Sequence, residues 1–296
     1  MEYFLARQPI FDSKMKVIGY ELFSYDGFEN LIPMDTKEDQ FASKVITKSF
    51  LLVNTESLTG GKKAFIRFSQ NLIVNEIVTL LDKDLIAIEL SDNITPDEKV
   101  LAACQKFKDS GYLMVLDDFN FQFSQMPFLQ FADMVKVDSG KTGSDMKKSV
   151  VERLKSKNIK SLMMNVESEE EFKEAVELGY DYFQGNFFRK PFVISGRDIP
   201  GYKLTYLQML KEIHQPEIDF DKMEEIIKRD VSLTYKLLRL INSAAFGIMR
   251  EIKSIKQALV LLGMREVKKW VALIALSDMG KEKPEELVKN ALLRAK

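Results

Sequence analysis

The chain has 296 residues, enough for two domains of ordinary size, with 46% hydrophobic and 29% charged residues and a formal net charge of −1. This near-neutral balance gives no indication of a general attraction to nucleic acid or anionic membranes, and no apolar run is long enough to span a bilayer. One cysteine, Cys104, excludes an intramolecular disulfide framework, and one histidine, His214, excludes His-rich metal sites and catalysis by a histidine pair. We therefore expect a cytoplasmic globular protein in which Cys104 is buried in a helix.

Short apolar runs recur through the first 190 residues and alternate with stretches of helical period. The runs predict strands at 4–11, 17–23, 64–68, 85–90, 113–116, 134–138, 160–166 and 182–187. Helices are predicted over 38–53 and 71–82, from the cap Thr95 to Gly111, over 142–157, and after a capping box at Ser168. Eight strands that mostly alternate with helices predict an α/β barrel. The short turn after the first strand makes that strand antiparallel to the others.

The functional site of such a barrel lies at the C-terminal ends of its strands. In the stretch 113–119, four apolar residues lead directly into Asp117 and Asp118. A solvated turn would explain this pair alone, but polar residues end several other predicted strands. Acidic residues at three successive strand ends suit a hard divalent cation, and Lys136 suits the activation of a water molecule. The strand-end residues are Glu21, Arg67, Glu89, Asp117, Asp118, Lys136, Asp138, Met164, Glu167 and Gln184.

Seven short segments occur in a recognisable order. They are ELFSY at 21–25, IRFS at 66–69, ELSD at 89–92, DDFN at 117–120, KVD at 136–138, MMNVE at 163–167 and QGNF at 184–187. Together they resemble an EAL domain, a barrel with an antiparallel first strand that hydrolyses cyclic di-GMP with two divalent metals. No single segment is specific, whereas seven in order are. The resemblance implies that the catalytic positions of the family correspond to Glu21, Glu89, Asp117, Asp118, Lys136, Glu167 and Gln184.

Four positions depart from the pattern of that family. Tyr25 stands where the family has an Arg that grips a substrate phosphate, so a permanently charged contact is lost. Met164 stands where the family has a Glu at the metal-bound water, and Asn120 replaces a Gly of the loop after the aspartate pair. Arg67 replaces the Asn that ligates metal, and a guanidinium cannot ligate a cation. These losses favour a site that binds no metal and retains the acidic residues as relics.

Arg67 is the residue we expect to replace the metal. Burying Glu21, Glu89 and Asp117 together without a cation would be expensive, and a guanidinium at their centre would remove that cost. We therefore predict that Arg67 lies within salt-bridge distance of at least one of them. Its removal is expected to destabilise the protein by about 3–5 kcal/mol. In the alternative, the side chain of Arg67 extends into solvent.

The remainder of the chain shows no strand signals after residue 204. Gly196, Pro200 and Gly201 mark a linker within 192–203. Helices are predicted over 204–214, 219–229, 231–242, 254–262, 264–278 and 284–295. We divide the chain into a barrel at 1–195, a linker at 196–203 and a helical domain at 204–296.

Three segments of the helical part are informative. They are IKRDVSL at 227–233, LLRLINSAAFG at 237–247 and IKQALVLLG at 255–263. They resemble the start of an HDOD domain, a helical module that lacks the metal-binding His and Asp residues of related phosphohydrolases. No histidine follows His214, which excludes metal-dependent hydrolysis by this part. Asn242, Ser243 and Phe246 are expected to end a helix, with Phe246 packed inward. A full HDOD domain is longer, so we expect a truncated chain with apolar surface that is exposed or covered by a second copy.

Two functions of different classes follow. The first is a non-catalytic signalling protein of the cyclic di-GMP network, in which the barrel is a scaffold and the helical part binds protein partners that the sequence does not name. The second is a cyclic di-GMP phosphodiesterase with an altered site, which would need Mg²⁺ or Mn²⁺; otherwise no cofactor is expected. A third reading, binding of cyclic di-GMP without cleavage, is weakened by Tyr25. A homodimer stays open, and no membrane or nucleic-acid partner is expected.

Overall fold

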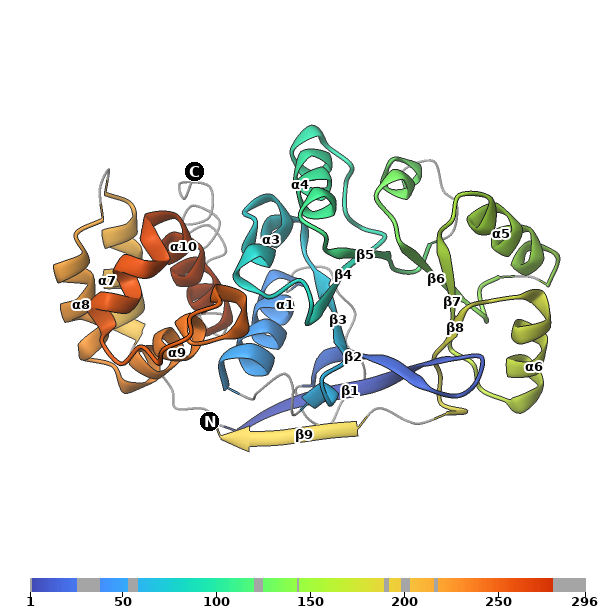
Figure 1. Cartoon of the computed structure of the whole chain (residues 1–296), viewed down its shortest axis with the longest axis horizontal. Coiled ribbons are helices and arrows are strands. Elements are labelled where there is room, and N and C mark those ends of the chain that lie inside the picture. Colours follow the sequence, from blue (N-terminus) through green and yellow to red (C-terminus); the bar gives the residue numbers. More distant parts are fainter. Residues whose placement is uncertain are drawn as a thin grey trace.

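The computed structural model describes residues 2–25, 38–52, 58–119, 125–142, 144–188, 192–197, 203–215 and 218–278. Its first part contains the strands β1 (Glu2–Asp12), β2 (Val17–Tyr25), β3 (Lys63–Phe68), β4 (Ile86–Leu90), β5 (Leu113–Leu116), β6 (Met134–Asp138), β7 (Lys160–Met164) and β8 (Tyr182–Phe183). Strands β2 to β8 pair in parallel, in chain order. β1 pairs antiparallel with β2 and with β8, which closes the sheet into a barrel (Figure 1). The predicted barrel with an antiparallel first strand is confirmed.

One further strand corrects the predicted linker. β9 (Phe192–Arg197) pairs antiparallel with residues Glu2–Arg7 of β1. β1 is eleven residues long, and only its far end, Phe11 and Asp12, pairs with β8. The rest of that edge offers backbone donors and acceptors that need partners, and β9 supplies them. Residues 196 and 197, the first two of the predicted linker, therefore belong to a strand, although the Gly and Pro content of 196–203 favours a linker.

The helices of the barrel lie outside the strands. They are α1 (Glu38–Ile46), continued by the π-helix η1 (Thr47–Leu52), α3 (Gln70–Val74), the 3₁₀ helices η2 (Ile77–Leu80) and η3 (Met126–Gln130), α4 (Glu98–Asp109), α5 (Ser144–Ser156) and α6 (Glu169–Leu178). The single helix predicted over 71–82 is wrong, because Glu76 adopts a left-handed φ of 54° and separates α3 from η2. The cap of α4 is Asp97 rather than Thr95, since the Asp97 side chain accepts a hydrogen bond from Val100 N at 2.9 Å. Ser168 caps α6 as predicted.

The barrel interior is built in layers. Phe65, Ala87, Val115, Met134, Leu162 and Ile10 form an apolar plug inside the strands. Because side chains alternate along a strand, the residue two positions further on points to the same side of the barrel. Those residues are Arg67 of β3, Glu89 of β4, Asp117 directly after β5, and Lys136 of β6, and they form the next layer, toward the mouth. Gly19 of β2 leaves room for the Phe65 ring, which a Cβ at position 19 would meet at 2.5 Å.

The second part of the chain is helical, as predicted. It comprises α7 (Lys203–Ile213), α8 (Phe220–Lys228), α9 (Val231–Ile241), the 3₁₀ turn η4 (Ala244–Phe246) and α10 (Ile255–Asp278). Gly263, with φ 73° and ψ 166°, divides α10 where the sequence predicts a helix end. Asn242 holds the following loop, because its side chain donates to Ile252 O at 2.8 Å and accepts from Ile252 N at 2.7 Å. Phe246 packs against the core. The helix predicted over 284–295 lies outside the described residues.

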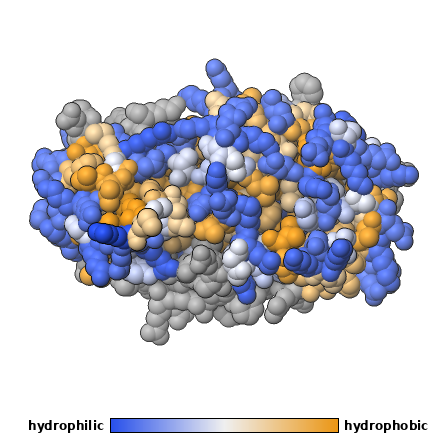
Figure 2. All heavy atoms as spheres, viewed as in Figure 1, coloured by the Kyte–Doolittle hydropathy of each residue, from blue (hydrophilic) through white to orange (hydrophobic). Residues whose placement is uncertain are grey.

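Apolar side chains in the helical part are both deeply buried and openly exposed. Every residue from Lys269 to Ser277 is buried. In the barrel, Cys104 of α4 is buried as expected. Exposed apolar side chains include Val231, Tyr235, Met249, Val260, Leu261 and Met264. Figure 2 shows apolar side chains among charged ones over the helical part, at the left of the view. Among the described residues, no helix has the length and apolar character needed to cross a membrane.

Candidate functional site

Four ionisable side chains meet at the mouth of the barrel. Glu21 of β2, Glu89 of β4 and Asp117, directly after β5, bring carboxylate oxygens within 4.8 Å of one another. The ammonium of Lys136, from β6, lies 2.8 Å from Glu21 Oε2, 2.7 Å from Glu89 Oε1 and 3.7 Å from Asp117 Oδ1. All four residues are buried, and Lys136 and Glu89 are fully so. We call these four residues the mouth cluster.

Burial and charge together set the protonation of the mouth cluster. Burial, reinforced by Glu21, raises the pKa of Glu89 to about 8 despite the neighbouring Lys136. Burial opposes charge on Lys136 as well, but Asp117, Glu21 and Glu89 outweigh it and raise its pKa above the ordinary lysine value. The pKa of Asp117 is lowered, because Lys136 and Arg67 overcome the effect of its burial. At neutral pH the ammonium therefore stays charged, while Glu89 favours its neutral form.

Arg67 lies at the rim of the mouth cluster. It is level with Glu89 in the pairing of β3 with β4, and its guanidinium forms an ion pair with Asp117. The Arg67 side chain keeps 33% of its surface exposed, whereas that of Lys136 keeps none. The expected contact with one of the three carboxylates is therefore present, but the expected position is not. The cation that contacts all three carboxylates is the ammonium of Lys136, from β6.

Gln184 completes the buried layer of the site. Its Nε2 donates to Glu21 Oε2 at 2.6 Å and to Gln8 Oε1 at 3.1 Å. Gln184 Oε1 and Glu89 Oε2 are buried acceptors to which the described residues supply no hydrogen-bond donor. Buried acceptors without a donor are uncommon in proteins. A bound cation or water at this place would satisfy both oxygens.

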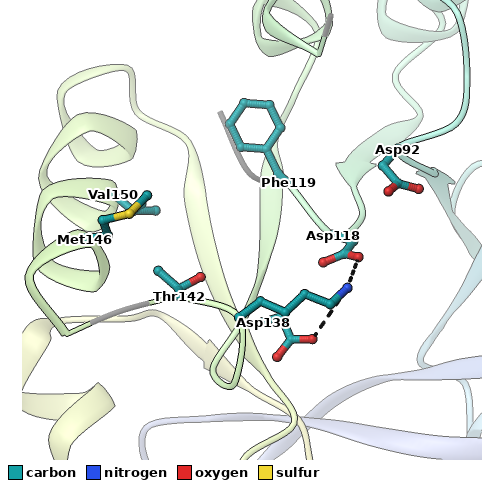
Figure 3. Close-up of a pocket in the computed structure, with 8 residues that line it drawn as sticks. Asp92, Asp118, Phe119, Asp138, Thr142, Met146 and Val150 are labelled. Atoms are coloured by element: carbon teal, nitrogen blue, oxygen red, sulfur yellow. Dashed lines mark hydrogen bonds and ion pairs between the residues drawn. The ribbon is translucent and has the colours of Figure 1, made fainter. Parts of the chain in front are cut away.

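Asp118 does not join Asp117 in the mouth cluster. It has a left-handed φ of 48°, and its carboxylate pairs with Lys141. Asp138 lies on the same side, 3.9 Å from Lys141 Nζ, and accepts a hydrogen bond from Asn165 Nδ2 at 3.0 Å. Figure 3 shows the carboxylates of Asp118 and Asp138 on either side of the lysine amine. They line a pocket of about 170 Å³ with Asp92, Phe119, Lys141, Thr142, Met146 and Val150. The aspartate pair is thus divided between two sites.

The remaining predicted positions are spread more widely. Glu167 is exposed, and its backbone N–H donates to Glu171 Oε2 at 2.8 Å, so it lies apart from the mouth cluster. Met164 is half-buried against the apolar plug of the barrel. Tyr25 ends β2, but its side chain is outside the described residues, as is the whole of Asn120. Lys141 was not among the predicted site residues. The turn SGK after Asp138 gives the only signal for it, because such a turn can fold a side chain back onto the preceding strand end.

Comparison with known families and proteins agrees with this architecture. The EAL domain family matches residues 40–191, and the HDOD domain family matches residues 199–294. An uncharacterized protein of Bacillus subtilis, YuxH, is 32% identical over all of this chain and 74% of its own length. The cyclic di-GMP phosphodiesterase CdgJ of Vibrio cholerae is 33% identical over 99% of this chain and 68% of its own length.

Solved structures resemble the barrel. The crystal structure of an EAL domain protein from Listeria monocytogenes superposes with a TM-score of 0.52 at 22% identity, over 64% of this chain and 88% of the other. Klebsiella pneumoniae BlrP1, in a complex with calcium and cyclic di-GMP, superposes with a TM-score of 0.54 at 21% identity, over 65% of this chain and 56% of the other. At these identities the likeness concerns the fold. By its two domain matches and by two relatives that align with nearly all of its length, the chain belongs to the family of proteins in which an EAL domain is followed by an HDOD domain.

Proposed function

We propose that this protein is a non-catalytic member of the cyclic di-GMP signalling network, with the barrel as a scaffold and the helical domain as a protein-interaction module. One observation carries the proposal. The Lys136 ammonium lies within 2.8 Å of both Glu21 and Glu89, and Arg67 pairs with Asp117 at the rim. Lys136 is a position that the family resemblance retains, so the departure that supports the proposal is Arg67, a cation paired with Asp117 where the resemblance expects an Asn that ligates metal.

The donor set fits two metals poorly. Beside the three clustered carboxylates, the described residues bring no further acidic side chain into the mouth, because Asp118 pairs with Lys141 and Glu167 is exposed. Arg67 and Met164 offer a cation and a thioether, and neither suits a hard divalent ion. Glu21, Glu89 and Asp117 have oxygens for one ion, with Gln184 Oε1 beside them. A single ion would have to displace Lys136 from the centre.

The helical domain supports an interaction role by its chemistry. The only histidine of the chain, His214, is at the end of α7, where its Nδ1 contacts Leu210 O. Hydrolysis with a histidine-bound metal is therefore not available to this domain. Its exposed apolar side chains, Val231 and Tyr235 on α9 and Val260 and Leu261 on α10, are the kind that protein partners cover.

A second candidate function is cleavage of cyclic di-GMP. It is favoured by the 33% identity to a protein named as a cyclic di-GMP phosphodiesterase and by the buried acceptors that lack a donor. In that case Glu21, Glu89 and Asp117 would hold a divalent ion, whose Lewis acidity would activate water and polarise a phosphate. Arg67 would then be placed to contact a phosphate at the rim.

The deciding experiment uses the whole chain. Purified protein is incubated with cyclic di-GMP and either Mg²⁺, Mn²⁺ or chelator, and the nucleotides are separated by chromatography. We expect no turnover above background with either ion. Binding is measured in parallel by calorimetric titration with cyclic di-GMP, so that a receptor that does not cleave is recognised as such.

Two variants control the assay. Metal-dependent turnover that disappears in Glu89→Gln would refute the non-catalytic proposal and establish the second candidate. Turnover that persists in Glu89→Gln would point to a contaminating enzyme. Glu152→Gln removes an exposed carboxylate of α5 and is the matched control for the loss of one negative charge.

A further inference from the structure

The helix α10 packs across the junction between the helical domain and the barrel, beside a smaller contact of α9 with η1. The second part of α10 is buried on all sides, from Lys269 to Ser277. As a whole, α10 packs against α7, α8 and α9 of its own domain and against α1, η1 and η2 of the barrel. Figure 1 shows α1 and α3 between the strands and α10. α1 follows β2, and α3 with η2 follows β3, so α10 rests on the segments that succeed the strands carrying Glu21 and Arg67.

A charged cluster holds α10 on this surface. The carboxylate of Glu76 pairs with Lys106 of α4 at 2.6 Å and with two residues of α10, Arg265 and, at 3.7 Å, Lys269. Lys269 Nζ also donates to Thr79 Oγ1 at 2.6 Å, and the Thr79 hydroxyl donates to the Glu76 backbone oxygen at 2.9 Å. Lys269 therefore contacts the Glu76 side chain directly and is linked to the Glu76 backbone through the Thr79 hydroxyl. We call Glu76, Lys106, Arg265 and Lys269 the Glu76 cluster.

A short, well-anchored segment runs from the Glu76 cluster to the mouth. Arg67 is near the end of β3, and the buried Ser69 then caps α3 by accepting from Leu72 N. α3 is only five residues long, and Glu76 follows its C-cap. Asn71 Nδ2 donates to Asp39 Oδ2 at 2.7 Å, which ties α3 to α1. Because the segment is close-packed, a displacement at Glu76 cannot be absorbed locally without cost.

We propose that the Glu76 cluster couples the helical domain to the barrel mouth. A change in how α10 sits against Glu76 shifts the segment 69–76, and with it the position of Arg67 at the rim. The left-handed backbone at Glu76 lies between two helices of different type, and the proposed shift would pass through it. The coupling is reciprocal, as linkage requires, and it does not depend on whether the mouth cleaves a ligand.

Amide hydrogen exchange of the full chain, followed by mass spectrometry, tests the coupling from both ends. Arg67→Gln should raise exchange rates in the part of α10 from Arg265 to Ala275 as well as in β3 and α3. Glu76→Gln should raise the exchange rates in both regions as well. We expect increases of about fivefold, the upper range for partly exposed ion pairs. Peptides from α6, which is remote from both clusters, serve as reference, because global destabilisation would raise their exchange equally.

Matched variants separate coupling from a local role. Lys256→Gln removes a charge of α10 that pairs with Asp221 inside the helical domain, and it should leave β3 and α3 unchanged. Arg67→Lys keeps the charge and should restore most of the protection in α10. If Arg67→Gln does not fold, the exchange rates of β3 and α3 are measured in Arg265→Gln instead. The Arg265 side chain is 62% exposed, so this variant should fold. Changes confined to the neighbourhood of each substituted residue, with the other region unchanged, would overturn the proposal.

Discussion

The mouth cluster and the Glu76 cluster have opposite charge patterns. At the mouth one ammonium, Lys136, contacts three carboxylates, whereas at the domain junction one carboxylate, Glu76, contacts three cations, of which Lys269 also pairs with Glu266 at 3.1 Å. The Lys136 side chain is fully buried, but Arg265 keeps 62% of its side chain exposed. Water can solvate a charge left behind at the junction and cannot do so at the mouth. We conclude that the free energy of unfolding lost on removing one charge depends on how deeply the cluster is buried, and less on how many ion pairs it contains.

The largest effect is expected from Lys136→Met. The substitution keeps much of the side-chain volume but leaves Glu21, Glu89 and Asp117 without their central cation. Unpairing a buried charge network typically destabilises a protein by about 3–5 kcal/mol. Urea denaturation followed by circular dichroism measures the loss, and Lys141→Met, at a lysine 66% exposed, is the matched control. A loss below about 1 kcal/mol for Lys136→Met would mean that Lys136 does not balance the acids. If Lys136→Met fails to fold, adding Glu89→Gln should recover folded protein.

The second prediction concerns pH. The folded state raises the pKa of Glu89 to about 8, so between the ordinary glutamate range and pH 8 it holds a proton that the unfolded chain releases. Stability should therefore fall as pH rises through this window, by up to about 1.4 kcal/mol per pH unit. Glu89→Gln mimics the protonated side chain and should remove most of that slope. Urea midpoints between pH 5.5 and 8.5 provide the measurement, with Glu152→Gln as control. An unchanged slope in Glu89→Gln would show that Glu89 is ionised throughout.

The third prediction revises the expectation for Arg67. Its side chain is one-third exposed, and Asp117 also has Lys136 at 3.7 Å. Arg67→Asn should therefore destabilise the protein by about 1–3 kcal/mol in chelator, the range for a charged hydrogen bond, rather than by the larger loss expected for a central counter-ion. Because Asn offers an oxygen ligand, added Mn²⁺ should recover part of the loss by binding the folded state. Arg67→Lys is the control that keeps the charge. Equal losses with and without Mn²⁺ would speak against a latent metal site.

Most of the fold could be predicted because the barrel strands are short apolar runs with clear ends. β9 could not, because Gly196 and Pro200 indicate a linker by composition, and only the unpaired edge of the long β1 gives the segment a partner. The break between α3 and η2 was missed for a related reason. The apolar period continues through it, and the left-handed conformation of Glu76 is held by contacts to α4 and α10 that lie far away in the sequence.

The candidate site, like the fold, has features that the sequence predicts and features that it does not. Strand-end positions were enough to bring Glu21, Glu89, Asp117 and Lys136 together, since alternation along each strand fixes which residues face inward. Alternation does not fix depth, which depends on the stagger of the strands, and so it could not distinguish a central Lys136 from a central Arg67. Nor could it show that Asp118 turns away from Asp117, because that depends on a left-handed backbone conformation stabilised by Lys141.

The smallest effect is expected at the domain junction, and salt makes it diagnostic. Glu76→Gln removes the shared carboxylate but leaves Arg265 and Lys106 in partial contact with water, while the buried Lys269 keeps Glu266 at 3.1 Å. The loss should therefore be about 0.5–1 kcal/mol at low ionic strength. Raising the salt concentration to about 1 M shortens the screening length to roughly 3 Å and should abolish most of this difference between wild type and variant. The loss caused by Lys136→Met should persist, because salt does not reach a fully buried group. Lys106→Gln, which removes only the barrel-side partner of Glu76, should give a still smaller loss with the same salt dependence. A Glu76→Gln stability loss that is large and insensitive to salt would mean that the Glu76 cluster behaves like the mouth cluster. Burial would then not explain the charge energetics of the two clusters.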